Sequence, residues 1–115
     1  MRPVVITQTG NGGTLNSAPI VMSWRANPTS ISLFFNTGGN TTQFTVQYTG
    51  DAPEDYTSAS SYNTDAKWFS HAFMAAMVAD LSGNIAYPVR AIRLQSNSSG
   101  TDTATLTIIQ SGVGD

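Results

Sequence analysis

The sequence contains no cysteine, and only 10% of its residues are charged. The absence of cysteine excludes disulfide bonds, thiolate metal sites and cysteine nucleophiles. Charged residues make up about 25% of an ordinary soluble domain, so this chain must rely on Thr, Ser, Asn and Gln for its solubility. A surface with so little charge is only weakly repelled by copies of itself. This favours a place in an assembly.

An excess of basic residues is also missing, since five basic and seven acidic residues give a net charge of -2. Such a chain offers no basic patch for nucleic acid and no polybasic segment for a membrane surface. We therefore expect neither partner. No apolar run approaches the length of a membrane span, and the opening MRPVVITQTG has too few apolar residues for a secretory signal peptide, so we expect none.

The only histidine is His71. A histidine-based metal site would have to take its other ligands from carboxylates. Ser70 precedes the histidine, but a catalytic triad needs groups that meet in space with an orienting acid, which adjacency does not supply. We interpret His71 as a structural residue in a turn beside Trp68 and Phe69. We expect no catalytic, cofactor-binding or metal-binding residue, no cofactor and no enzymatic activity.

At 115 residues the chain has the length of one domain, and we predict a single domain over residues 1–115. Residues 87–110 read as two strands joined by a polar turn. In the second arm Leu106 and Ile108 lie on one face and threonines on the other, and the first arm matches it with Ile92 and Leu94 inward. We therefore predict a hairpin with these four residues as structural anchors, covered by further strands because a lone hairpin is marginal in water.

The rest of the chain offers these further strands, each bounded by Gly, Asn or Pro. They are expected at residues 4–9, 19–25, 31–36 and 43–49. The TGGN sequence at residues 37–40 predicts that the last two form a second hairpin. Strands at such regular spacing predict an all-β fold, an antiparallel β-sandwich or jelly roll.

Residues 50–67 are different, because they have almost no aliphatic side chains and contain four of the seven acids. We predict a long loop, and loops of this length are usually functional or mobile. Asp51, Glu54 and Asp55 could in principle ligate calcium, a hard cation that prefers oxygen. They lack the spacing of a known calcium loop, so we interpret them as turn residues.

Trp68 and Phe69 end this loop, and we predict that both anchor it to the core. Residues 71–81, HAFMAAMVADL, carry apolar side chains four apart, as in a short helix. A strand fits the same run, because short apolar stretches are ambiguous on periodicity alone. A short helix near residues 71–81 and a strand therefore both remain open.

Arg90 is the one charged residue that alternation places on the core face, with Ile92, whereas Arg93 falls on the outer face. A buried, unpaired arginine would be too costly. Arg90 is therefore expected to be a structural residue that reaches the rim, lies at a bulge, or pairs with an acid such as Asp80 or Asp102.

Four stretches, in order along the chain, resemble small virion proteins of tailed bacteriophages. They are MRPVVIT at the start, KWFSH at 67–71, YPVRAIRL at 87–94 and ATLTIIQSG at 104–112. The resemblance spans nearly the whole chain, and its motifs are strands rather than chemistry. It implies a head decoration (cement) protein, a β-sandwich or jelly roll that binds the outside of the capsid and bridges major capsid subunits.

The partners that the resemblance implies are the major capsid protein and further copies of the chain, as a dimer or trimer on the particle. The protein would be made in the cytoplasm of the host bacterium and lie on the virion surface. The N-terminal strand, which is apolar on both faces, and the acidic loop are expected to make the contacts. The expected interface residues are Val4, Val5, Ile6, Asp51, Glu54, Asp55, Tyr56 and Tyr62.

Two other functions fit the same features. The IRL strand, the polar turn and the Thr-rich final strand are also similar to discoidin-like jelly rolls, which suggests a carbohydrate-binding module. Sugar sites use exposed aromatic side chains, and the candidates are Trp24, Tyr56, Tyr62 and Trp68, although core positions are the preferred interpretation of the tryptophans. The other alternative is a connector or tail component of the virion.

Overall fold

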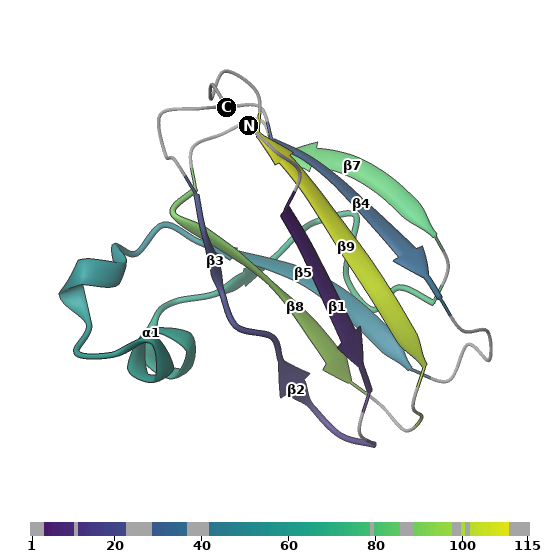
Figure 1. The fold of residues 1–115 in the computed structure, drawn as a ribbon, viewed down its shortest axis with the longest axis horizontal. Coiled ribbons are helices and arrows are strands. Elements are labelled where there is room, and N and C mark those ends of the chain that lie inside the picture. Colours follow the sequence, from purple (N-terminus) through teal and green to yellow (C-terminus); the bar gives the residue numbers. More distant parts are fainter. Residues whose placement is uncertain are drawn as a thin grey trace.

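The computed structural model describes residues 4–10, 12–22, 29–36, 42–78, 80–85, 89–97, 100 and 102–110. This part of the chain forms two antiparallel β-sheets that pack face to face, with one short α-helix at one end (Figure 1). The predicted all-β sandwich is confirmed.

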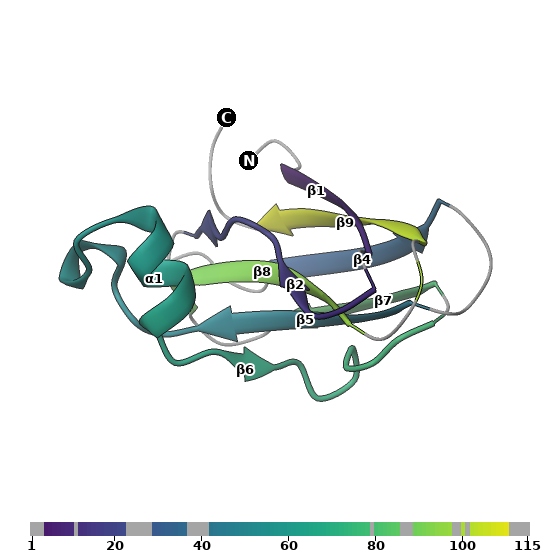
Figure 2. The same ribbon diagram turned by 90° about the horizontal axis from the view of Figure 1, so that it is seen from below.

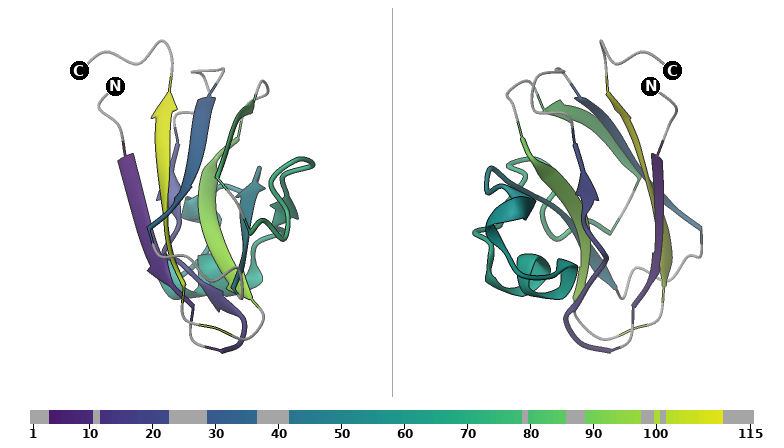
Figure 3. Two further views of the ribbon diagram at one scale, coloured as in Figure 1. Left: turned by 90° about the vertical axis from the view of Figure 1, so that its right-hand side faces the viewer. Right: turned by 60° about the vertical axis from the view of Figure 1, so that its left-hand side comes forward.

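Sheet A has four strands in the order β1-β9-β4-β7. Their bounds are β1 Val4–Thr9, β9 Thr103–Gln110, β4 Thr29–Phe35 and β7 Leu81–Ile85. Sheet B has the order β2-β8-β5-β6, and β3 also pairs with β8. Its strands are β2 Leu15–Asn16, β3 Ile20–Val21, β8 Ala91–Asn97, β5 Gln43–Thr49 and β6 Phe69–Ser70. Figure 3 shows the two layers, with β1, β9 and β4 in one and β8 in the other.

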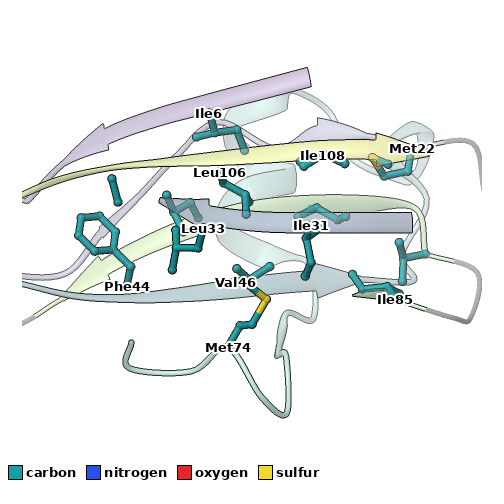
Figure 4. Close-up of a cluster of buried hydrophobic side chains, with 14 residues drawn as sticks. Ile6, Met22, Ile31, Leu33, Phe44, Val46, Met74, Ile85, Leu106 and Ile108 are labelled. Carbon is teal, nitrogen blue, oxygen red and sulfur yellow. The ribbon is translucent and has the colours of Figure 1, made fainter. Parts of the chain in front are cut away.

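The core lies between the sheets and follows from the alternation of apolar side chains. In β4, Ile31 and Leu33 are buried, while the alternating residues Ser30 and Ser32 face solvent. The four anchors predicted from the sequence are fully buried in this core: Ile92, Leu94, Leu106 and Ile108. Each such side chain contributes about 1.5–3 kcal/mol by leaving water. Figure 4 shows side chains from both sheets meeting in one layer.

The two hairpins predicted from the sequence are not formed. β8 lies in sheet B and β9 in sheet A, and likewise β5 lies in sheet B and β4 in sheet A. Each pair exchanges partners, so that β4 pairs with β9 and β5 with β8. The turn at residues 37–40 lies outside the described residues. Alternation could not distinguish these arrangements, because strands of both sheets turn their apolar faces toward the same core.

The short helix near residues 71–81 is also not found; among the described residues of this stretch there are turns, bends, one β-bridge and, at Leu81, the start of β7. Its backbone instead bonds to the edge of β5: the His71 N–H donates to the Val46 carbonyl at 2.8 Å, and the Val46 N–H donates to the Met74 carbonyl at 2.9 Å. Met74 is buried, whereas Phe73 faces solvent. The segment therefore lies against sheet B as an irregular edge.

Gln8 closes the sandwich at the β1 side. Its buried side-chain amide Nε2 donates to the Leu15 carbonyl at 2.8 Å and lies 3.2 Å from both the Leu94 carbonyl and the Ser96 hydroxyl. These acceptors belong to sheet B, so one side chain from β1 bridges both sheets. Separating β1 from sheet B would leave the buried Gln8 amide without acceptors, at a cost of about 1–3 kcal/mol. The hydrogen bonds of Gln8 therefore hold β1 against sheet B.

Candidate functional site

The segment predicted as a long loop, residues 50–67, folds over the outer side of sheet B. It contains a 3-10 turn, η1 (Pro53–Asp55), and the helix α1 (Ala59–Asp65). Tyr62 and Ala66 of this segment pack on Ala91 at the start of β8. Figure 2 shows α1 beside the ends of β8 and β5. The segment is therefore a structured cover, and the outer side of this sheet does not face water there.

Helix α1 begins at a cap that the sequence contains. Ser58 is the N-cap; its side chain accepts from the Ser61 N–H at 3.1 Å, and the Ser61 hydroxyl accepts from the Ser58 N–H at 3.0 Å. This reciprocal pair satisfies two backbone donors at the helix start. Tyr62 and Ala66, four residues apart, then face the sheet. The cap and this spacing were the signals in the sequence that could have revealed the helix.

Asp51 holds both ends of this cover together. Its Oδ2 accepts from the Tyr56 hydroxyl at 3.0 Å and from the Lys67 N–H at 2.9 Å, and its carbonyl accepts from the Tyr62 hydroxyl at 2.8 Å. The Lys67 N–H and then the Tyr56 hydroxyl hold the pKa of Asp51 below its ordinary value. Burial raises the pKa of Tyr62 to about 12. Asp51 and Tyr62, expected at an interface, therefore bind within the chain.

The other acids of the segment are exposed. Asp55 faces solvent, and Glu54 forms an ion pair with Arg90, whose Nη2 lies 3.0 Å from Glu54 Oε1. Arg90 thus reaches the rim, as one of the predicted alternatives had it, but its partner is neither Asp80 nor Asp102. Among the described residues, no group of three or more His, Cys, Asp or Glu side chains is placed to hold a metal ion.

Arg93, which alternation places on an outer face, is buried beneath the cover with 6% of its surface exposed. Its Nε donates to Gln47 Oε1 at 2.8 Å, and its Nη1 lies 2.6 Å from both the carbonyl and the side-chain oxygen of Asn63. Its Cζ lies 4.2 Å from the centre of the Trp68 ring. Burial lowers the pKa of Arg93. The burial of Arg93 was not predicted, because alternation alone places it on an outer face of β8 that would be open to water without the cover.

Trp68 and Phe69 behave differently although both were predicted as anchors. Trp68 is half-buried and packs against Tyr62, whose ring centre lies 5.9 Å away. Phe69 is 57% exposed, and its ring contacts Tyr48 at the edge of sheet B at 6.0 Å. Adjacent residues of a strand point to opposite sides, so only Trp68 faces the cover. The prediction for Phe69 is wrong.

The outer face of sheet A is lined by side chains that are exposed or half-buried in the described residues. Within the four strands, its outward positions are Val5, Thr7, Thr9, Ser30, Ser32, Phe34, Ser82, Asn84, Thr103, Thr105, Thr107 and Ile109. None is charged. The pairing aligns them in rows across the strands; one row is Val5, Thr107, Ser32 and Ser82. We call this surface the threonine face.

Exposed apolar side chains lie among the hydroxyls of the threonine face. Val5 is 54% and Phe34 55% exposed, and Ile109 is also exposed. Val4 and Ile6, the other two expected interface residues of β1, point inward and pack against the core. Of the three expected interface residues in β1, Val5 is therefore the one with an exposed side chain.

A groove of about 430 Å³ lies at the opposite edge of the sandwich, between β7 and residues 71–74. We call it the β7 groove. His71 forms part of its lining, and both ring nitrogens are engaged: Nε2 donates to the Asn84 carbonyl at 2.9 Å, and Nδ1 accepts from the Phe73 N–H at 3.2 Å. Neither nitrogen is free to act as a general base in this arrangement. Phe73, at 79% exposure, forms the outer wall.

The aromatic residues considered for sugar binding are mostly covered. Tyr62 is buried, and Trp68 lies beneath Arg93 and the cover. Tyr56 is half-buried and lines a hollow of about 310 Å³ with Val21 and Pro53. Trp24 lies outside the described residues. The most exposed aromatic side chain in the described residues is instead Phe73, beside the β7 groove.

In the described part of the chain, no helix is long and apolar enough to cross a membrane. Comparison of the chain with protein-family models, curated proteins and solved structures finds no match.

Proposed function

We propose that this chain is a non-catalytic attachment protein that docks on a protein assembly through uncharged β-sheet surfaces. The assembly that we propose is the head of a tailed bacteriophage. There the chain binds the outside of the major capsid protein, bridges its subunits and associates with one or two further copies of itself. It is made in the cytoplasm of the host bacterium and lies on the virion surface.

The observation that carries this proposal is the threonine face. All its outward strand positions are uncharged, and Val5, Phe34 and Ile109 expose apolar surface there. Burying such side chains against a partner gains about 25 cal/mol for each Å² removed from water. No residue of the face itself carries a charge that would lose its hydration, and the nearest described acid is Asp80, exposed beside Phe34 at the rim. Some hydroxyls of the face form hydrogen bonds with one another, as those of Thr9 and Thr103 do at 2.7 Å. These bonds lower the free-energy cost of removing water from the face.

A capsid suits this surface because a shell presents many copies of one flat protein lattice. Each copy of the chain then needs only a modest interface, since neighbouring contacts add through effective concentration. The resemblance to small virion proteins supplies the choice of a phage head among protein assemblies. We further propose that the protein catalyses no hydrolysis or group transfer.

The test is binding to empty heads assembled from the major capsid protein that is encoded in the same genome as this chain. Phe34→Glu places a charge on the threonine face, in the row of Thr7 and Thr105, and should lower the affinity at least about tenfold, because the carboxylate must lose water on docking. Phe69→Glu is the matched control, because Phe69 has nearly the same exposure, 57% against 55%, and lies on sheet B.

Binding of Phe34→Glu at the wild-type level would contradict docking through this face. A genome without a capsid gene would contradict the phage head itself. Thermal melts of both variants establish that they are folded, which is expected because both side chains are exposed. A wild-type protein that binds sugars on a glycan array and ignores the heads would favour the carbohydrate-binding alternative.

A further inference from the structure

The open edge of β7 offers backbone groups that have no partner among the described residues. We propose that this edge binds an extended peptide segment of a partner, which adds a fifth strand to sheet A and places a side chain in the β7 groove. Figure 1 shows β7 at the edge of the sheet, beyond β4. The proposal does not depend on which assembly the chain joins.

The hydrogen bonds of the neighbouring strand β4 show which N–H and C=O groups of β7 face away from sheet A. The Asn36 N–H donates to β9, whereas the Phe35 N–H donates to Asp80 Oδ1 at 2.8 Å, on the β7 side. The odd-numbered residues of β4 therefore bond to β7, and their register partners in β7 are also odd-numbered. Ser82 and Asn84 consequently direct their N–H and C=O groups away from the sheet.

These outward groups are available to a ligand. The Asn84 carbonyl accepts from His71 Nε2, but no partner for the Ser82 N–H, the Ser82 carbonyl or the Asn84 N–H exists among the described residues. Both residues are exposed. Proteins usually protect such an edge with lysine, proline, a bulge or a covering segment. The sequence of β7, LSGNI, contains neither lysine nor proline.

The β7 groove would hold the side chains that an added strand directs toward the space between the sheets. Alternate side chains of that strand would face the space between the sheets, where Phe73, Met74 and Leu81 form apolar walls. Gly83 keeps this space open, because a Cβ there would already contact Met74 Sδ at 3.6 Å. None of the described residues that line the groove is an acid, a lysine or an arginine. The preferred segment is therefore uncharged, with a medium-sized apolar side chain at the groove.

A second folded copy does not fit this site as well as a free segment does. The edge strand β1 has similar outward groups, but its inward side chains Val4 and Ile6 are packed in their own core and cannot enter another groove. β1 is also a poor acceptor, because Gln8 ties it to sheet B and closes the sandwich there. An extended segment that is not part of another sheet can pair its backbone with β7 and also place a side chain in the β7 groove.

A displayed library of random linear heptapeptides, panned on the folded protein, tests this inference without knowledge of the natural partner. We expect enriched peptides that are uncharged and apolar at alternate positions. Ser82→Pro deletes an edge donor and should lower the affinity of a synthetic selected peptide at least about tenfold, because proline cannot donate to an added strand. Thr7→Pro is the matched control at the other open edge and should change the affinity less than about twofold.

Amide hydrogen exchange on the wild-type protein gives a second readout that needs no substitution. The Ser82 and Asn84 amides should exchange fast in the free protein and slowly in the complex, while the Thr7 amide should be unchanged. Three results would overturn the proposal: no enrichment over a panning without protein, undiminished binding to folded Ser82→Pro, or protection elsewhere. Sugar binding on a glycan array that Phe73→Ala abolishes and Ser82→Pro leaves intact would also overturn it.

Discussion

The guanidinium carbon of Arg93 lies 4.2 Å from the centre of the Trp68 ring, on the side of sheet B that the sequence predicts to face water. A buried arginine without a carboxylate partner is costly, and here Gln47, Asn63 and the aromatic ring replace that partner. This contact joins β8 to the cover formed by residues 50–67. The cover is therefore part of the fold, although acids on its outer side, such as Asp55 and Asp65, remain exposed.

Arg93→Ala should lower the free energy of unfolding by about 3 kcal/mol, because it removes hydrogen bonds of a charged group and leaves buried acceptors unpaired. Arg90→Ala is the control, since its ion pair with the exposed Glu54 is worth about 1 kcal/mol or less. Urea unfolding of the two variants measures the difference. Equal losses would show that the contact beneath the cover contributes no more than a surface pair.

Asp51 should make the protein sensitive to acid. Its pKa in the folded protein lies below the ordinary 3.8, because the carboxylate accepts the Lys67 N–H and the Tyr56 hydroxyl. The unfolded chain therefore takes up the proton first, so the stabilisation is present above about pH 4 and is lost as the pH falls through the folded pKa. Melting temperatures of Asp51→Asn should fall less steeply with acid than those of the wild type. Asp55→Asn, at an exposed acid, should keep the wild-type slope.

Gly10 marks a close approach between loops. A Cβ at this position would lie 2.7 Å from Thr42 Cγ2 and 2.9 Å from the Gly100 carbonyl oxygen. Thr42 cannot yield easily, because its hydroxyl accepts from the Asp102 N–H at 3.1 Å. Gly10→Ala should destabilise the fold by about 1–3 kcal/mol. Gly50→Ala, with no atom within 4 Å of its Cβ, should stay within about 0.5 kcal/mol, and a similar loss in both would contradict the packing argument.

Ala76 has a left-handed backbone, with φ of 54°. The left-handed region costs an L-residue roughly 1–2 kcal/mol, which the N–H of Ala76 offsets in part by donating to the Thr45 hydroxyl at 2.8 Å. Ala76→Gly should therefore raise the melting temperature. At Ala75, which has no positive φ, the same change should lower it, because glycine adds freedom to the unfolded chain. A lower melting temperature for Ala76→Gly would contradict the claim that the backbone of Ala76 is strained.

The sequence predicted strands well where the pattern is local. The bounds of β1 and β5 agree with the expected ranges, because alternation of side chains depends only on neighbouring residues. It could not predict their partners, since β4 and β5 direct the same pattern at one core from opposite sheets.

The site was less predictable because it depends on contacts between distant residues. Asp51, predicted as an interface residue, accepts a hydrogen bond from Lys67 sixteen residues away, which the sequence does not reveal. Residues 71–81 have helical spacing, yet their backbone bonds to the edge of β5 outweigh it. The threonine face was visible in the sequence as outward residues of single strands. Its extent was not, because it depends on which strands lie side by side.

Attachment through uncharged surfaces is tested most directly by the occupancy of the wild-type protein on empty heads across a salt series, with duplex DNA as a parallel ligand. Apolar and backbone contacts are not screened by salt, and even several exposed ion pairs are worth only about 0.2–1 kcal/mol each. We predict a loss of less than about tenfold between about 50 and 200 mM salt, and no DNA binding. A DNA-binding protein with six to ten phosphate contacts would lose about 10³–10⁵. A steep loss on the heads, or tight binding to the duplex, would contradict attachment through the threonine face.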